Sequence, residues 1–209
     1  MTSRRGFGTL SLNVTSGGVQ KTMTIQEQLQ RFIPCDEQET ADLGLILDAL
    51  YKYPDIFERS NQVMHMTASS WIINPSREKV LMIYHNIYDS WAWTGGHADG
   101  ERDLCLVAER EAREETGLSD LNLLLPDPIS VEILTVNSHI KHGCFVPSHL
   151  HLNVTYLFMA NDQQAIRAKT DENKAVAWFG LDDAVKACSE PWMRPIYAKL
   201  NRKVLDLNR

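Results

Sequence analysis

The sequence predicts an α/β (α+β) fold in which a mixed β-sheet is sandwiched between helices and preceded by an N-terminal helical extension. Strand-type segments stand on both sides of one central helical segment, at residues 63–97 and 129–181. The central segment, from about residue 103 to 117, and the last one, residues 191–207, carry apolar residues at helical spacing. Strands before and after a central helix, with a further helix near the end, favour a mixed sheet covered by helices.

The N-terminal 60 residues divide into two parts. Residues 1–22 are rich in Ser, Thr and Gly and contain no acid, which predicts a flexible tail, with a transit peptide as the alternative. Residues 23–60 repeat apolar side chains near the helical period, and Pro34 divides this stretch. We therefore expect two helices in the extension.

Residues 61–190 hold the predicted main domain. Two strand-type runs within residues 63–85 flank the turn sequence NPSREK, which predicts a hairpin. A short strand then leads through SWAWTGG into a glycine loop and the central helix. Further strands are expected at residues 129–136, 150–160 and 175–181, and a helix at 181–189. Residues 191–209 are expected to form a C-terminal helix that packs on the domain.

The composition and net charge of the chain disfavour several functional classes of protein. A chain of 209 residues with 44% hydrophobic and 23% charged residues can build one substantial core. The net charge of −6 disfavours a nucleic-acid partner, because phosphate-backbone binding needs a basic face. The four cysteines form no CxxC pair, so a reducing cytoplasm fits better than a disulfide framework. No run of roughly 18 apolar residues exists, so no membrane association is expected.

The predicted central helix carries apolar residues on one face in its first half and glutamates on the same face in its second half. Its apolar stripe consists of Leu104, Val107 and Ala108. At about 100° per residue, the stripe continues into Glu111, Glu114 and Glu115, which share one face. Like charges directed toward an interior are unfavourable, and a hard divalent cation that prefers carboxylate oxygen would offset that cost. A salt-bridge network with Arg110 is the alternative.

The glutamates and a preceding glycine resemble the signature motif of a known family. Gly96 followed at residues 110–118 by REAREETGL resembles the Nudix box, which has a glycine before a REUxEExGU ending, where U is aliphatic. The resemblance covers the box closely and residues 61–190 by their order of elements, and it implies a Nudix-like sheet. The N-terminal helices lie outside it.

One position departs from the box. The first glutamate of the family falls here on Arg102, between Glu101 and Asp103. In the family this glutamate braces the loop by pairing with the box arginine. We expect Glu101 to reach Arg110 through a shortened loop, and the alternative is that Asp103 takes this role while it caps the helix.

The resemblance implies a metal-dependent hydrolase that uses Mg²⁺ or Mn²⁺. Water would attack phosphorus in a diphosphate linkage of a nucleoside-diphosphate-X-type small molecule, the expected partner. The implied metal ligands are the backbone carbonyl of Gly95 and the carboxylates of Glu111, Glu114 and Glu115. Glu111 and Glu115 are the firmest of these, whereas Glu114 is either the third ligand or the general base.

Two further residues receive roles by the same resemblance. Arg110 is expected to orient the glutamates. Glu172 precedes a late strand, in the region from which many family members supply another acid, so it is an alternative base. An exposed loop acid with no catalytic role is the other interpretation of Glu172.

A histidine-rich segment lies in the second half of the chain. His149 and His151 alternate on one face of a predicted strand, and His139 and His142 lie upstream. Together they could bind a transition metal such as zinc, contact substrate phosphates, or have structural roles. Trp93, just before the glycines, could stack on a base, although core packing is the favoured interpretation.

Two other functions compete with hydrolysis. An isopentenyl-diphosphate isomerase of the same fold uses a cysteine just before the box region, where this chain reads DSWAWTGGHADG with none. A catalytically inactive Nudix-like binding or regulatory module typically has eroded glutamates, whereas these are intact. The sequence does not identify the leaving group of the reaction. The N-terminal helices could form a homodimer interface or a lid.

Overall fold

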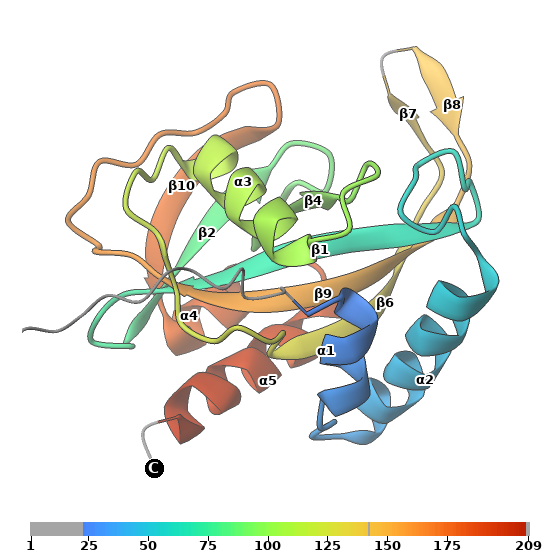
Figure 1. Ribbon diagram of the computed structural model, residues 1–209. Coiled ribbons are helices and arrows are strands. Elements are labelled where there is room, and N and C mark those ends of the chain that lie inside the picture. The colour runs from blue at the N-terminus through green and yellow to red at the C-terminus, as the bar shows by residue number, and fades with distance from the viewer. Residues whose placement is uncertain (1–22, 142, 208–209) are drawn as a thin grey trace, which may run out of the picture.

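The computed structural model describes residues 23–141 and 143–207 (Figure 1). The predicted flexible tail, residues 1–22, lies outside the described residues. The helices are α1 (Ile25–Arg31), α2 (Glu37–Lys52), α3 (Leu104–Thr116), α4 (Leu181–Ala187) and α5 (Met193–Asp206). Thus the predicted central and C-terminal helices are both present, as α3 and α5.

The strands form one large sheet and a separate small hairpin. The large sheet contains β1 (Met64–Ile73), β2 (Lys79–His85), β3 (Ser90–Ala92), β4 (Thr94–His97), β5 (Asn122–Leu123), β6 (Ser130–Val136), β9 (His149–Met159) and β10 (Asn173–Gly180). Its main order is β10-β2-β1-β9-β5, with β3 beside β2, β4 beside β1 and β6 beside β9. Because β1 and β9 run parallel while β1 and β2 run antiparallel, the predicted mixed sheet is confirmed.

Helices cover both faces of this sheet. Along β1, Met66, Ala68 and Ile72 belong to the hydrophobic cluster that includes the buried residues of α3. The intervening Trp71 and Ile73 belong to a second cluster with residues of α5. This alternation follows from the period of two in a strand, and Figure 1 shows α3 and α5 on opposite sides of β1. The predicted sandwich is therefore confirmed.

The N-terminal helices are part of the main core. Pro34 lies between α1 and α2, where the sequence predicts a break. At the start of α1, Thr24 and Glu27 form a reciprocal capping box. Leu29 of α1 and Ile46 of α2 are fully buried in the same hydrophobic cluster as the α3 face of β1. The extension therefore shares one core with the sheet.

Local signals account for some strands and not for others. The NPSREK turn joins β1 and β2, with Ile73 opposite Val80, as predicted. The hairpin of β7 (His139–Lys141) and β8 (Cys144–Val146) has no apolar alternation in sequence and was not expected. Figure 1 shows it projecting beyond the large sheet. Within the described chain, no helix is long and apolar enough to cross a membrane.

Candidate active site

The helix that carries the acidic residues is fixed at both ends. The Asp103 carboxylate caps its start by accepting hydrogen bonds from the backbone N–H groups of Cys105 and Leu106, at 3.1 and 3.3 Å. Gly117 ends it with a φ of 73°, the left-handed conformation that glycine adopts without strain. The end predicted at Gly117 is confirmed, and Asp103 caps the helix as the alternative interpretation of this loop proposed, so the orientation of α3 is set locally.

The three glutamates of α3 differ in their exposure. Glu115 is only 3% exposed, the Glu111 side chain is 18% exposed, and the Glu114 side chain is 47% exposed. The expectation of one common inward face is therefore only partly right. Glu114 and Glu115 project on opposite sides of Glu111, and the core lies on the Glu115 side.

Glu115 is a buried carboxyl group with few interactions that would stabilise its charged form. Its Oε2 atom accepts a hydrogen bond of 3.0 Å from the backbone N–H of Gly95. Burial, with smaller contributions from the negative charges of Glu111 and Glu172, raises the pKa of Glu115 to about 8. Among residues 23–141 and 143–207, no Lys or Arg forms an ion pair with it. A bound cation would favour its ionised form.

Glu111 lies against the glycine loop. Its Oε1 atom is 3.0 Å from Nη2 of Arg110, and burial raises its pKa above the ordinary value despite this partner. A Cβ atom on Gly96 would lie 2.4 Å from the Glu111 carboxyl carbon. Residue 96 must therefore be glycine for this carboxylate to keep its position beside β4.

A distant loop supplies another acid and a lysine. Nζ of Lys169 is 3.2 Å from the Glu114 carboxylate and 2.9 Å from that of Glu172. Next along the chain, the buried Asn173 side chain donates a 3.0 Å hydrogen bond to the backbone carbonyl of Glu115. This bond anchors the loop at the end of α3, so the structure brings Glu172 to the glutamate cluster. Lys169 was not predicted, because no local pattern marks it.

The sequence profile of the NUDIX domain matches residues 63–200. The chain belongs to the Nudix family. The match begins after the N-terminal helices, and it confirms the family expected from the box residues. The chain is therefore placed among the Nudix hydrolases. No curated protein matches the chain in sequence.

Solved Nudix structures resemble this chain at low sequence identity. The E. coli dihydroneopterin triphosphate pyrophosphohydrolase is 16% identical with a TM-score of 0.51, over 66% of this chain and 95% of that one. The C. elegans Ap4A hydrolase is 17% identical with a TM-score of 0.48, over 68% and 98%. The NUDIX domain of Shewanella oneidensis NrtR, solved with ADP ribose, is 18% identical with a TM-score of 0.46, over 75% and 97%. At these identities the likeness concerns the fold alone.

The Nudix box residues suit a hard divalent cation. The carboxylates of Glu111, Glu114 and Glu115 offer oxygen donors, the ligands that Mg²⁺ prefers, and Glu115 has no cationic partner in the described chain. Each carboxylate now contacts a protein group: Arg110, Lys169 or the Gly95 N–H. The three are not among the groups whose ligand atoms all lie within 4.8 Å of one another. Binding an ion would exchange these contacts for coordination.

The loop of this Nudix box is braced differently from our expectation. Oε1 of Glu101 accepts hydrogen bonds from the backbone N–H groups of Arg102 and Asp103, at 2.8 and 2.9 Å. The expected contact between Glu101 and Arg110 is wrong, because each side chain is held by a nearer partner. A bidentate ion pair between Arg59 and Asp99 ties the loop to the segment before β1 instead.

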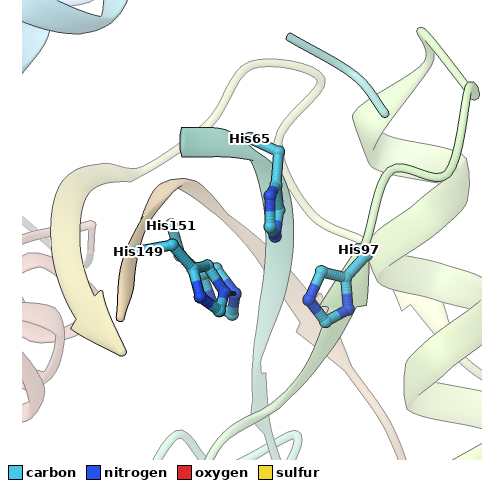
Figure 2. Close-up of side chains that lie close together, drawn as sticks. All are labelled: His65, His97, His149 and His151. Carbon is cyan, nitrogen blue, oxygen red and sulfur yellow. Dashed lines mark hydrogen bonds between the residues drawn. The ribbon is translucent and has the colours of Figure 1, made fainter. Parts of the chain in front are cut away.

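Two of the predicted histidines join two that were not predicted. Figure 2 shows His149 and His151 grouped with His65 and His97. Five of the ring-centroid distances within this histidine cluster lie between 4.8 and 5.1 Å. Burial, together with nearby positive groups, lowers the pKa of His151 to about 2. His65 and His97 are far from the HxH pair in sequence, so only the fold reveals them.

The remaining candidate residues from the sequence are His139, His142 and Trp93. His139 is on β7 and contacts the carbonyl oxygen of Asn137, outside the histidine cluster. His142 lies outside the described residues. Trp93 is 9% exposed and packs edge-on against Tyr197 of the core, whose hydroxyl accepts a hydrogen bond from the Trp93 backbone N–H. Its surroundings are those of a core residue.

Proposed function

We propose that this Nudix protein is a hydrolase that uses Mg²⁺ or Mn²⁺ to cleave a diphosphate linkage in a nucleoside-diphosphate-X-type small molecule. The supporting observation is the carboxyl group of Glu115, which is buried beside the partly buried Glu111 and has no Lys or Arg partner among the described residues. Such an oxygen-rich, negatively charged site binds a hard cation. When bound, the ion would neutralise phosphate charge and acidify the attacking water.

Each residue of the site has a role in this proposal. Glu111, Glu115 and the Gly95 carbonyl would hold the ion, and Arg110 would keep the Glu111 carboxylate oriented. Glu114 would act as third ligand or as general base. These are proposals that combine the family pattern with the contacts around α3.

Glu172 is the second candidate for the general base. It shares Lys169 with Glu114, so both acids lie where a proton could be taken from water. Comparing Glu114→Gln with Glu172→Gln separates them, because loss of the base removes the acidic limb of the pH–rate profile. Loss of a ligand raises the metal concentration needed for half-maximal activity instead.

Activity on a panel of diphosphates tests the proposal directly. Nucleotide sugars, dinucleotides, oxidised nucleotides and coenzyme diphosphates would be incubated with Mg²⁺ or Mn²⁺, and phosphate release would be read after a coupled phosphatase. We expect turnover of at least one class, its abolition by EDTA and its recovery on adding Mg²⁺. Full turnover in metal-free protein would overturn the mechanism, and binding without turnover would favour a regulatory module.

Location and assembly are further proposals. The four cysteines are free thiols, which suits a reducing cytoplasm. The N-terminal helical region exposes Ile33, Leu45 and Tyr51 at its surface, which would suit a homodimer contact. Light scattering on the purified protein, with Tyr51→Ser as a comparison, distinguishes a dimer from a monomer.

A further inference from the structure

We propose that the histidine cluster of His65, His97, His149 and His151 is a binding site for a divalent transition-metal ion such as Zn²⁺, distinct from the carboxylate site. All four side chains offer a ring nitrogen, and these atoms lie within 4.8 Å of one another. His65 is buried and the other three are partly exposed, so the cluster is partly accessible to solvent. The inference does not depend on the hydrolytic function.

The strand register explains why these residues meet. His65 of β1 is the direct partner of His151 on the parallel strand β9. His97 of β4 is opposite Thr67, two residues beyond His65 on the same face of β1. His149 precedes His151 by two residues and therefore shares its face. Four imidazoles from three adjacent strands thus project from one end of the sheet, as Figure 2 shows.

Backbone carbonyls orient two of the rings for metal binding. Nδ1 of His65 is 3.0 Å from the carbonyl oxygen of Asn61, and Nδ1 of His149 is 2.9 Å from that of Pro147. A carbonyl oxygen only accepts, so each Nδ1 carries the proton and each Nε2 presents a lone pair. Metal-ligating histidines are typically held in this way by an acceptor on their second nitrogen.

The Nε2 atoms of His65, His149 and His151 are placed for coordination. Nε2 of His65 is buried and has no hydrogen-bond partner in the part of the chain that the structure describes. Leaving such an atom unpaired is unfavourable, and coordination would satisfy it. Nε2 of His149 is 3.1 Å from Nε2 of His151. Two ligands of a tetrahedral zinc ion lie about 3.4 Å apart when the Zn–N distance is about 2.0–2.1 Å, so this pair already has nearly the required spacing.

The chemistry of the donors separates the two sites. Imidazole nitrogen favours Zn²⁺, Cu²⁺, Fe²⁺ or Ni²⁺, whereas carboxylate oxygen favours Mg²⁺ and Mn²⁺. His97 follows Gly95 and Gly96 directly on β4. An ion at the histidine cluster would therefore tie β4 to β1 and β9 beside the two glycines that contact Glu111 and Glu115.

Metal titration of the full-length, tag-free protein tests the site. After removal of metal with a chelator, Co²⁺ would be added in excess Mg²⁺, and visible d–d absorption would be followed. We expect one equivalent of Co²⁺ with the strong absorption of a four-coordinate nitrogen site, displaced stoichiometrically by Zn²⁺. A folded protein that binds no Co²⁺ or Zn²⁺ beyond the carboxylate site would overturn the proposal.

Matched variants assign the ligands. His149→Ala/His151→Ala should lose the absorption and the equivalent of bound Zn²⁺. His139→Ala should retain both, because His139 makes the same kind of Nδ1–carbonyl contact, at 3.0 Å, outside the histidine cluster. Glu111→Gln/Glu115→Gln should also retain them. Unchanged binding in the His149/His151 variant, or loss in the glutamate variant, contradicts the assignment.

X-ray absorption keeps the proposal testable if the histidine variant does not fold. At the zinc edge, the wild-type protein should show a shell of nitrogen ligands with the outer-shell scattering of several imidazoles. A shell of oxygen ligands without imidazole scattering would place the ion at the glutamates and overturn the histidine site.

Discussion

At the scale of the residue, Glu115 provides the sharpest test of the carboxylate site. Replacing it by Gln removes an ionisable group that is buried without a cationic partner among the described residues, so metal-free Glu115→Gln should melt at the same temperature as the wild type or higher. Saturating Mg²⁺ should stabilise the wild type by RT ln(1 + [L]/Kd) and the variant much less. Turnover should fall on the order of 100-fold or more. Melting curves with and without Mg²⁺, alongside kcat, measure all three.

Glu109→Gln is the matched control for this substitution. Glu109 lies on the same helix and pairs with Arg113 at 2.8 Å, with both side chains 35% exposed. Its replacement should leave the Mg²⁺ effect and kcat nearly unchanged. A Glu115→Gln protein that is strongly destabilised yet catalytically intact would instead identify Glu115 as a structural residue.

The raised pKa of Glu115 also predicts how stability depends on pH. Between the ordinary value of 4.5 and about 8, the native state holds this proton more tightly than the unfolded state does. The free energy of unfolding of the metal-free protein should therefore fall as pH rises through this window, by about 1.4 kcal/mol for each unit of pKa difference. Urea unfolding in EDTA at pH 5.5 and 8 should show a smaller fall for Glu115→Gln. Equal falls would contradict the assignment.

At the scale of the element, the close approach of β4 to α3 depends on one glycine. A methyl group at residue 96 would lie 2.4 Å from the Glu111 carboxyl carbon, so Gly96→Ala must displace that carboxylate. We expect kcat/KM to fall at least ~10-fold, which corresponds to about 1.4 kcal/mol of lost transition-state stabilisation. Mg²⁺ should also bind more weakly.

Gly44→Ala is the comparison for this change. Gly44 is exposed on α2, and a Cβ there would meet nothing within 4 Å. Alanine should stabilise the helix by up to about 1 kcal/mol and leave activity unchanged. If both glycine variants retained full activity, the contact between β4 and Glu111 would be irrelevant to function.

At the scale of the whole molecule, a buried ionic network joins the N-terminal extension to the C-terminal helix. Glu39 of α2 is fully buried and pairs with Lys199 and Lys203 of α5. Lys199 also lies 3.4 Å from the buried carboxylate of Glu132 on β6. Burial alone would raise the pKa of Glu39, but hydrogen bonds from Lys203, the Cys35 N–H and other donors outweigh it and lower the pKa to about 2.

Breaking this network should affect stability strongly. Glu39→Gln removes the carboxylate partner of the partly buried Lys203 and one of the two carboxylate partners of the buried Lys199, so we expect a loss of about 3–5 kcal/mol in the free energy of unfolding. Because the pKa of Glu39 is lowered on folding, its contribution is present above about pH 4.5 and is lost as pH falls toward 2. The difference between wild type and variant should shrink over that range in urea unfolding.

Asp48→Asn provides the control on the same helix. Asp48 pairs with Lys52 at 2.7 Å, and both side chains are more than half exposed. Its replacement should cost less than about 1 kcal/mol. Equal losses for Glu39→Gln and Asp48→Asn would show that the network does not hold the extension to the core.

Sequence by itself determined the features that depend on spacing along the chain. The period of apolar residues located α3 and α5, Pro34 separated α1 from α2, and NPSREK placed the hairpin of β1 and β2. The interval from Gly96 to the box glutamates indicates the Nudix family, which the domain match over residues 63–200 confirms. These signals are readable because a helix turn, a cap or a hairpin is fixed by residues only a few positions apart.

Only the tertiary structure decided which distant side chains meet. Lys169 reaches Glu114 across 55 positions of sequence, and His65 meets His151 through strand register. The different exposure of Glu114 and Glu115 likewise depends on what packs against α3. A sequence records the order of side chains, whereas strand pairing and helix docking are cooperative outcomes of burying the whole core, so long-range convergence becomes visible only in the fold.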